Sequence, residues 1–411
     1  MEENLIKYAD LILKKGLNIQ EGEPLLIVGP MERVDFVRLL TKRAYEMGIR
    51  RIEYDLDDEY IKHEALLTLT EEELEHSSLF DRTIIKEVSD AGGCLLYLEG
   101  CDPNLMSDVP PSKLAAVRKV SIRTQGDSIE KRGRYDTPWV IAAVPTKAFA
   151  EKVFGVGDDA IEKLWEAIFK CCYIDKEDPL KYWEEKTKRD DQRARTLTQL
   201  KLKKLHYKNA LGTDLVVGLN PGTIWEAAAT QSEAKNRNLL VNIPTEEVFT
   251  SPNYRDVSGT VYASKPLVHN GSIIENFYLV FKEGKVVEYH AEKGEEYLKA
   301  ILDTDEGAKS LGEVALVEYH SPISSMNILF YTTLYDENAS CHLALGRGFP
   351  LCIENGGQMS KDELLKVGVN ESDTHVDFMI GTKDLSIVGE DEKGTLYPIF
   401  EKGDFCLEES M

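Results

Sequence analysis

The sequence changes character part-way along the chain, and this change limits the folds that it can adopt. Up to about residue 186, short buried runs alternate with segments of helical apolar spacing, as in EPLLIVG (23–29), ERVDFVRLLTKRAYEMG (32–48) and RRIEYDL (50–56). This pattern predicts βαβ units around a sheet. Beyond about residue 187, apolar and polar residues alternate with a period of two, and Gly or Asn-Gly turns interrupt them, which predicts antiparallel hairpins. We therefore expect an α/β protein with an N-terminal α/β domain (1–186) containing a mostly parallel sheet, and a C-terminal α+β domain (187–411) rich in antiparallel strands.

The N-terminal pattern continues with a predicted helix over about 70–89, strands at 93–99 and 139–144, and a charge-dense helical connector over roughly 158–200. Sheets of this kind often bind nucleotides, but the sequence lacks the GxGxxG and GxxxxGK[ST] phosphate-binding patterns. Nothing local therefore predicts a nucleotide cofactor.

Composition excludes several classes of protein. A chain of 411 residues exceeds one ordinary core, and its formal net charge of -23 would repel nucleic acid. The first residues form an amphipathic helical pattern without the basic start and apolar block of a signal peptide, and no apolar run approaches a membrane span. Seven cysteines without CxxC spacing argue against a disulfide framework and a structural zinc site. We expect a cytoplasmic protein that binds neither nucleic acid nor membrane.

The run THVDFMIGT contains two candidate metal ligands. If it is a strand, His375 and Asp377 project from one face, while Val376 and Phe378 project from the other. A histidine that is hydrogen-bonded to a nearby acid is also a common structural pair, so His-x-Asp alone does not identify a metal site.

The run LYDENASCHLALG offers two more candidates. We expect Asp336 or Asn338 to cap a helix whose first turn contains His342 and which ends near Gly346. Glu337 and His342 reach one ion only if Glu337 lies in the turn before that helix. Otherwise His342 is an ordinary packed residue.

Two upstream segments carry further acids. In VNIPTEEVFTSP, the neighbours Glu246 and Glu247 must face opposite ways on an extended segment, so only one of them can enter a site. Glu313 opens a strand-like run directly after Gly312. Either acid could instead be solvated, which is the usual state of a glutamate.

Four acids and two histidines together would suit a pair of Zn, Co or Mn ions. Two such ions activate water and stabilise an oxyanion, which suits amide hydrolysis.

The four motifs NIPTEEVFTSP, GEVALVEY, LYDENASCHLALG and THVDFMIGT occur in this order, and the chain opens with YADLILKKGLNIQEGEPLLI. In these features the sequence resembles the M29 metallopeptidase family, the group of aminopeptidase T, aminopeptidase S and PepS, over essentially its whole length. The resemblance implies a C-terminal catalytic domain with the metal ligands Glu247, Glu313, Glu337, His342, His375 and Asp377. It also implies that Glu313 lies between the metals and acts as the catalytic base.

The resemblance further implies a homodimeric aminopeptidase whose sites open into an internal cavity and cleave the N-terminal residue of small peptides. Its cofactor would be two divalent ions, zinc or cobalt, with manganese or magnesium as alternatives.

One position departs from the family. The family commonly carries a tyrosine seven residues after the motif histidine, where this chain has Phe349. A phenyl ring donates no hydrogen bond, so Tyr335, Tyr331 or Arg347 would have to stabilise the oxyanion, or the reaction differs.

Two other functions are consistent with the residues. His342, His375 and Asp377 alone would make the two-histidine, one-carboxylate set of a mononuclear non-haem iron enzyme, such as a ring-opening dioxygenase on a related scaffold. A non-catalytic binding protein is the other alternative, although such a protein would be expected to lose ligands, and all six are present.

Overall fold

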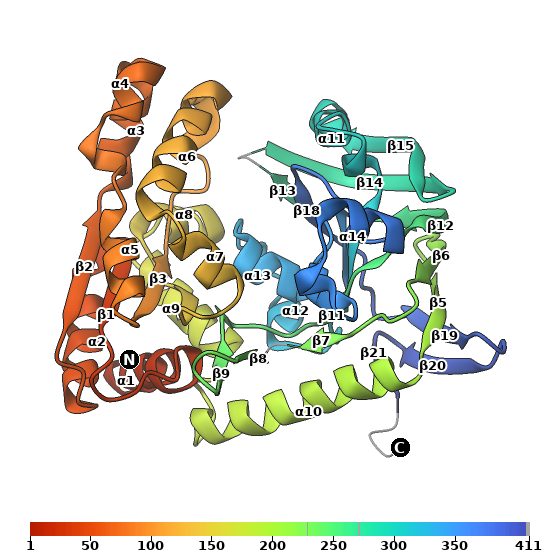
Figure 1. Ribbon diagram of the computed structural model, residues 1–411, viewed down its shortest axis with the longest axis horizontal. Coiled ribbons are helices and arrows are strands. Elements are labelled where there is room, and N and C mark those ends of the chain that lie inside the picture. The colour runs from red at the N-terminus through yellow and green to blue at the C-terminus, as the bar shows by residue number, and fades with distance from the viewer. Residues whose placement is uncertain (228, 270–271, 408–411) are drawn as a thin grey trace. The chain divides into compact units, whose positions relative to one another are not determined.

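The structure is a computed structural model that describes residues 1–227, 229–269 and 272–407 (Figure 1). The chain forms two compact units. Unit 1 comprises residues 1–185 and 229–244, and unit 2 comprises residues 186–228 and 245–411. The compact units differ from the expected domains at residue 186, which is in unit 2, and by the excursion of residues 229–244. The domain division into 1–186 and 187–411 stays a prediction. Among the described residues, every helix is too short or too polar to cross a membrane.

Unit 1 is built on a five-stranded sheet in the order β2-β1-β3-β4-β10, in which every pair is parallel. Its strands are β1 (Leu25–Pro30), β2 (Ile52–Asp57), β3 (Cys94–Glu99), β4 (Trp139–Ala143) and β10 (Asn242–Ile243). Its α-helices are α1 (Glu2–Leu11), α2 (Val34–Glu46), α3 (Glu59–Thr68), α4 (Glu71–Glu75), α5 (Thr83–Asp90), α6 (Pro111–Gln125), α7 (Ser128–Gly133), α8 (Lys147–Phe154) and α9 (Ala160–Cys171). The excursion also supplies the small antiparallel pair β8 (Ala229–Ser232) and β9 (Arg237–Leu240).

The core of unit 1 follows from the patterns in its sequence. Leu25, Leu26 and Ile27 are fully buried in β1, as expected for a strand of a parallel sheet with helices around it. The amphipathic helices α1 and α9 contribute aromatic rings to this core. Tyr8 and Trp165, one from each helix, meet edge to face with their ring centroids 6.1 Å apart.

The described residues of unit 2 form two antiparallel sheets. The larger sheet has the order β13-β14-β12-β6-β5-β19-β20-β21, with β15 paired to β14. Its strands are β5 (Leu202–Lys208), β6 (Asp214–Leu219), β12 (Pro252–Tyr262), β13 (Leu267–His269), β14 (Ser272–Lys282), β15 (Lys285–Lys293), β19 (Ser386–Asp391), β20 (Leu396–Glu401) and β21 (Asp404–Phe405). The smaller sheet has the order β18-β17-β16-β11-β7. Its strands are β7 (Glu226–Ala227), β11 (Val248–Thr250), β16 (Leu311–Leu316), β17 (His342–Gly346) and β18 (His375–Met379).

The α-helices of this part of the chain are few and mostly short. The long helix α10 (Pro179–Gln199) begins before the division at residue 186 and continues into unit 2 (Figure 1). The others are α11 (Glu295–Leu302), which packs on β14 and β15, α12 (Pro322–Met326), α13 (Thr333–Asp336) and α14 (Lys361–Val367). The parallel sheet of unit 1 and the antiparallel sheets of unit 2 confirm the predicted fold class.

Two predicted elements differ from the structure. The helix expected over 70–89 is interrupted, because α4 ends before His76 and α5 begins only at Thr83. Between them, the side chains of Ser77 and Asp81 accept hydrogen bonds from nearby backbone N–H groups, which competes with helix formation. The prediction that His342 lies in the first turn of a helix is wrong, because His342 is the first residue of strand β17.

Candidate metal centre

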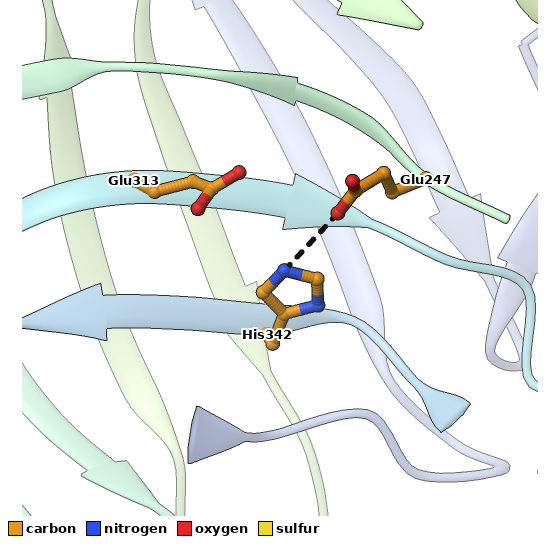
Figure 2. Close-up of side chains that lie close together, drawn as sticks. All are labelled: Glu247, Glu313 and His342. Atoms are coloured by element: carbon orange, nitrogen blue, oxygen red, sulfur yellow. Dashed lines mark ion pairs between the residues drawn. The ribbon is translucent and has the colours of Figure 1, made fainter. Parts of the chain in front are cut away.

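Five of the six predicted side chains meet in unit 2 in two overlapping sets. One ligand atom each from Glu247, Glu313 and His342 lie within 4.8 Å of one another (Figure 2). Ligand atoms of Glu313, His375 and Asp377 satisfy the same limit. Glu313 belongs to both sets, which makes it the central residue of the cluster.

The smaller sheet explains how residues that are distant in sequence come together. Glu313 on β16 pairs with Ala344 on β17, and Ala344 pairs with Asp377 on β18. Side chains that are paired across antiparallel strands, or that are two apart on one strand, share a face. Glu313, His342, His375 and Asp377 therefore project from one side of the sheet, and the small side chain of Ala344 leaves space between them. Glu247 directly precedes β11, the strand next to β16.

Both histidines use one ring nitrogen for a backbone carbonyl and direct the other toward the acids. Nδ1 of His375 lies 2.7 Å from the carbonyl oxygen of Arg347, and Nδ1 of His342 lies 3.3 Å from that of Ser340. A carbonyl oxygen only accepts, so each Nδ1 carries the proton of that bond. Nε2 of His342 is then 3.3 Å from Oε2 of Glu247 (Figure 2). Nε2 of His375 is 3.1 Å from Oε2 of Glu313 and 3.3 Å from Oδ1 of Asp377.

Glu337 lies outside both sets but close enough to interact with them electrostatically. It opens a short 3-10 turn, Glu337–Ala339, which follows α13. Burial raises the pKa of Glu337 well above its usual value, and the negative charges of Glu247 and Asp377 raise it further. The condition set by the sequence, that Glu337 precede the element carrying His342, is met, although that element is a strand.

The charges of the cluster fit a divalent cation. Burial, partly offset by the hydrogen bond to His375, raises the pKa of Glu313 to about 7. Burial opposes the charge on His342, but the hydrogen bond to Glu247 and the negative charges of Glu247, Glu313 and Asp377 together outweigh it and raise the pKa of His342 to about 10. Protons on the imidazoles thus balance acids that repel one another in a buried space. A mixed set of carboxylates and imidazoles is the donor chemistry that Zn, Co and Mn bind in proteins, so the residues present fit such ions.

A buried network supports the segment that carries Glu247. The Glu246 side chain belongs to neither ligand set, and its Oε2 lies 3.3 Å from Nζ of Lys186. Lys186 Nζ also donates to Oδ2 of Asp190 at 2.7 Å and to the Thr245 carbonyl at 3.1 Å. Lys186 and Asp190 are each only 2% exposed. The cation therefore holds Glu246 and the peptide before it, as expected from the opposite orientations of the two glutamates.

Asn338 links this network to Glu337. Its Oδ1 accepts the backbone N–H of Glu246 at 2.7 Å, and its Nδ2 donates to Oε1 of Glu337 at 3.3 Å. The sequence pattern predicted only a helix cap for Asn338. It contained no signal for Lys186, which lies among many charged residues of α10.

Phe349 borders the cluster directly. Its ring centroid is 5.0 Å from that of His375, and the Phe249 ring meets it edge to face at 5.5 Å. Of the suggested replacement donors, Tyr335 is fully buried and stacks on Phe330 at 4.6 Å, and Arg347 is exposed and donates its Nε–H to the Ser372 carbonyl. The side of the cluster next to His375 is therefore aromatic and apolar.

Cys341, which precedes His342, has a packing role. It is 1% exposed, and its Sγ donates to the Val317 carbonyl at 3.3 Å. Burial raises the pKa of its thiol to about 12. A thiol in this state is a poor nucleophile.

Comparisons with known proteins agree with the resemblance noted in the sequence. Residues 1–405 match the family profile described as thermophilic metalloprotease (M29). Aminopeptidase 2 from Geobacillus stearothermophilus is 41% identical over 409 residues, which cover 99% of this chain and 98% of that protein. The structure of wild-type AmpT from Thermus thermophilus superposes with a TM-score of 0.90 at 35% identity, covering 99% of this chain and 100% of the other. The structure of 2,5-dihydroxypyridine dioxygenase from Pseudomonas putida has a TM-score of 0.50 at 11% identity, covering 100% and 98%, and shares the fold alone.

Proposed function

The chain belongs to the thermophilic metalloprotease family M29, and from this premise we propose that it is a metal-dependent aminopeptidase that removes the N-terminal residue of small peptides. The supporting relatives are named aminopeptidases and match nearly the whole chain. The ring-opening dioxygenase has only a shared fold at 11% identity in its favour, so we do not propose it.

We propose a co-catalytic centre for two divalent ions, zinc or cobalt, with manganese or magnesium as alternatives. The observation that carries this proposal is the membership of Glu313 in both ligand sets. Glu247 and His342 would hold one ion, His375 and Asp377 the other, and Glu313 would bridge them, with Glu337 as a further ligand. Such ions, when bound, activate a water molecule and stabilise the oxyanion formed from the peptide carbonyl.

The side chains of the protein supply the remaining steps. Glu313, at the centre of the cluster, would accept the proton of the attacking water and deliver it to the departing amine. The rings of Phe249 and Phe349 offer an apolar surface next to His375 for the side chain of the first residue.

Chelation tests the proposed activity. Protein stripped of metal should lose hydrolysis of leucine p-nitroanilide and regain it when zinc or cobalt is added. Glu313→Gln, which keeps the shape of the side chain but removes the base, should stay inactive after metal is added, while its circular dichroism matches that of the wild type. Activity that survives chelation would refute a metal-dependent aminopeptidase, and one iron per chain would indicate an oxygenase.

We also propose a homodimer located in the cytoplasm, with small peptides as substrates, as in the family that the sequence resembles. Light scattering coupled to size-exclusion chromatography measures the assembly directly. A mass near twice the 46.4 kDa of one chain is expected, and a monomer would contradict it.

A further inference from the structure

Lys265 is a half-buried cation in the turn between β12 and β13, and this turn is hydrogen-bonded to the end of β18. Within the described part of the chain, no residue forms a hydrogen bond or an ion pair with its side chain. Burial lowers the pKa of Lys265, and only the charge of Asp336 acts in the other direction. The chain has 72 acidic residues and 49 lysines and arginines, so a half-buried lysine without a direct acidic partner is unexpected.

Two segments that carry site residues flank Lys265. On one side, the N–H of the preceding Ser264 donates to the Met379 carbonyl at 2.8 Å. Met379 ends β18 two residues after Asp377, on the same face of the strand. On the other side lies Asp336, the residue before Glu337.

Asp336 does not neutralise Lys265 by a direct contact. Its Oδ1 accepts the backbone N–H of Phe330 at 2.8 Å, and only 8% of the residue is exposed. Its carboxylate therefore organises the loop before α13. A partly desolvated ammonium group without a direct partner is costly, and a bound anion would recover part of that cost.

We propose that Lys265 binds the C-terminal carboxylate of short peptide substrates and so makes the enzyme prefer di- and tripeptides with a free carboxyl end. This inference rests on the proposed aminopeptidase function. Cleavage at the metal centre fixes the N-terminus of the substrate there, so the C-terminal carboxylate of a short peptide lies close by and can be bound by a nearby cation. An extended chain advances roughly 3.3–3.6 Å per residue, which means that only a short peptide keeps its carboxylate close to the centre.

Three leucyl substrates separate carboxylate binding from catalysis: Leu-Gly-Gly, its C-terminal amide, and leucine p-nitroanilide, which has no carboxylate. For Lys265→Met we expect kcat/KM on Leu-Gly-Gly to fall about 10- to 100-fold, mainly through KM, as for the loss of a charged hydrogen bond. The values for the amide and the anilide should change less than about 2-fold. Lys265→Arg should keep most of the activity on the free acid, because it keeps the positive charge.

Lys208→Met is the matched control, because Lys208 is also in unit 2 but its side chain is 68% exposed. It should leave all three substrates unchanged. Equal losses on the acid and the amide, or no loss on the acid, would overturn the role of Lys265. A wild-type protein that fails to cleave leucine p-nitroanilide with metal present would instead refute the proposed function, and this inference with it. Unfolding curves of the variants check that the fold is intact.

Discussion

At the scale of single residues, Phe349 is the feature that most distinguishes this site. Its ring lies 5.0 Å from the His375 ring, at the position for which the family resemblance implies a tyrosine. We expect Phe349→Tyr to raise kcat on leucine p-nitroanilide by about 10-fold or more, since one oxyanion donor is typically worth 10²–10³-fold. Steady-state kinetics of the wild type and the variant, loaded with the same amount of metal, measures this change in kcat. An unchanged or lower kcat would indicate that another donor already serves the oxyanion.

Asn338 illustrates how a neutral side chain supports charged ligands. It bonds the Glu246 backbone and the Glu337 carboxylate at once. We expect Asn338→Ala to weaken metal binding by about 10- to 100-fold, as is typical for loss of a group that orients a ligand. Competition against a fluorescent chelator measures the affinity.

The control for Asn338 is another buried asparagine. Asn220 is 3% exposed and donates to the Pro252 carbonyl at 3.3 Å. Asn220→Ala should lower stability but leave metal affinity unchanged. If both variants lose affinity equally, the effect of Asn338 is general destabilisation.

At the scale of elements, the buried charges between α10 and the segment before β11 form a unit. Lys186 is the cation shared by Asp190 and Glu246, which would remain buried without it. We expect Lys186→Met to lower the free energy of unfolding by about 3–5 kcal/mol. Urea unfolding followed by circular dichroism measures the change.

Lys181→Met is the comparison for this variant, because Lys181 is on the same helix with its side chain 72% exposed. Its effect should stay within about 0.5 kcal/mol, as for most surface substitutions. A loss of similar size in the two variants would contradict a special role of the buried cation.

The elements also explain which parts of the structure could be predicted from the sequence. In β18, Val376 and Phe378 are 3% and 1% exposed and alternate with the more exposed His375 and Asp377. This period of two correctly predicted a strand there. In β17 every residue is buried, so the strand has no alternation, and Leu and Ala favour helices. The prediction of a helix at His342 was wrong for this reason: in a short run that is apolar on both faces, the sequence pattern does not distinguish a strand from a helix.

At the scale of the whole molecule, the change near residue 187 from alternating strand and helix patterns to period-two alternation was sufficient to predict the fold class. A parallel sheet is covered on both faces, so its strands are continuous apolar runs. An antiparallel sheet often has one exposed face, so apolar and polar residues alternate along its strands. The order of the strands was not predictable in this way. Nothing local in the sequence indicates that Glu313 pairs with Ala344, or that residues 229–244 contribute β10 to the parallel sheet. The convergence of the candidate ligands depends on these long-range pairings, and only the family resemblance indicated it.

Bound metal should stabilise the whole molecule as well as activate it. Ions that bind the folded state alone raise its stability in proportion to the logarithm of their concentration over Kd. They also relieve the repulsion among Glu247, Glu313, Glu337 and Asp377. We expect chelation to lower Tm in differential scanning calorimetry by several degrees, and zinc to restore it. An identical Tm with and without metal would argue against ions at this cluster.

The two-metal centre is tested most directly by an anomalous diffraction experiment on crystals grown with zinc or cobalt, recorded above and below the absorption edge of the metal. Two anomalous peaks per chain are expected, one touching Glu247 and His342 and the other touching His375 and Asp377, with Glu313 between them. A single peak, or two peaks that avoid Glu313, would contradict this centre.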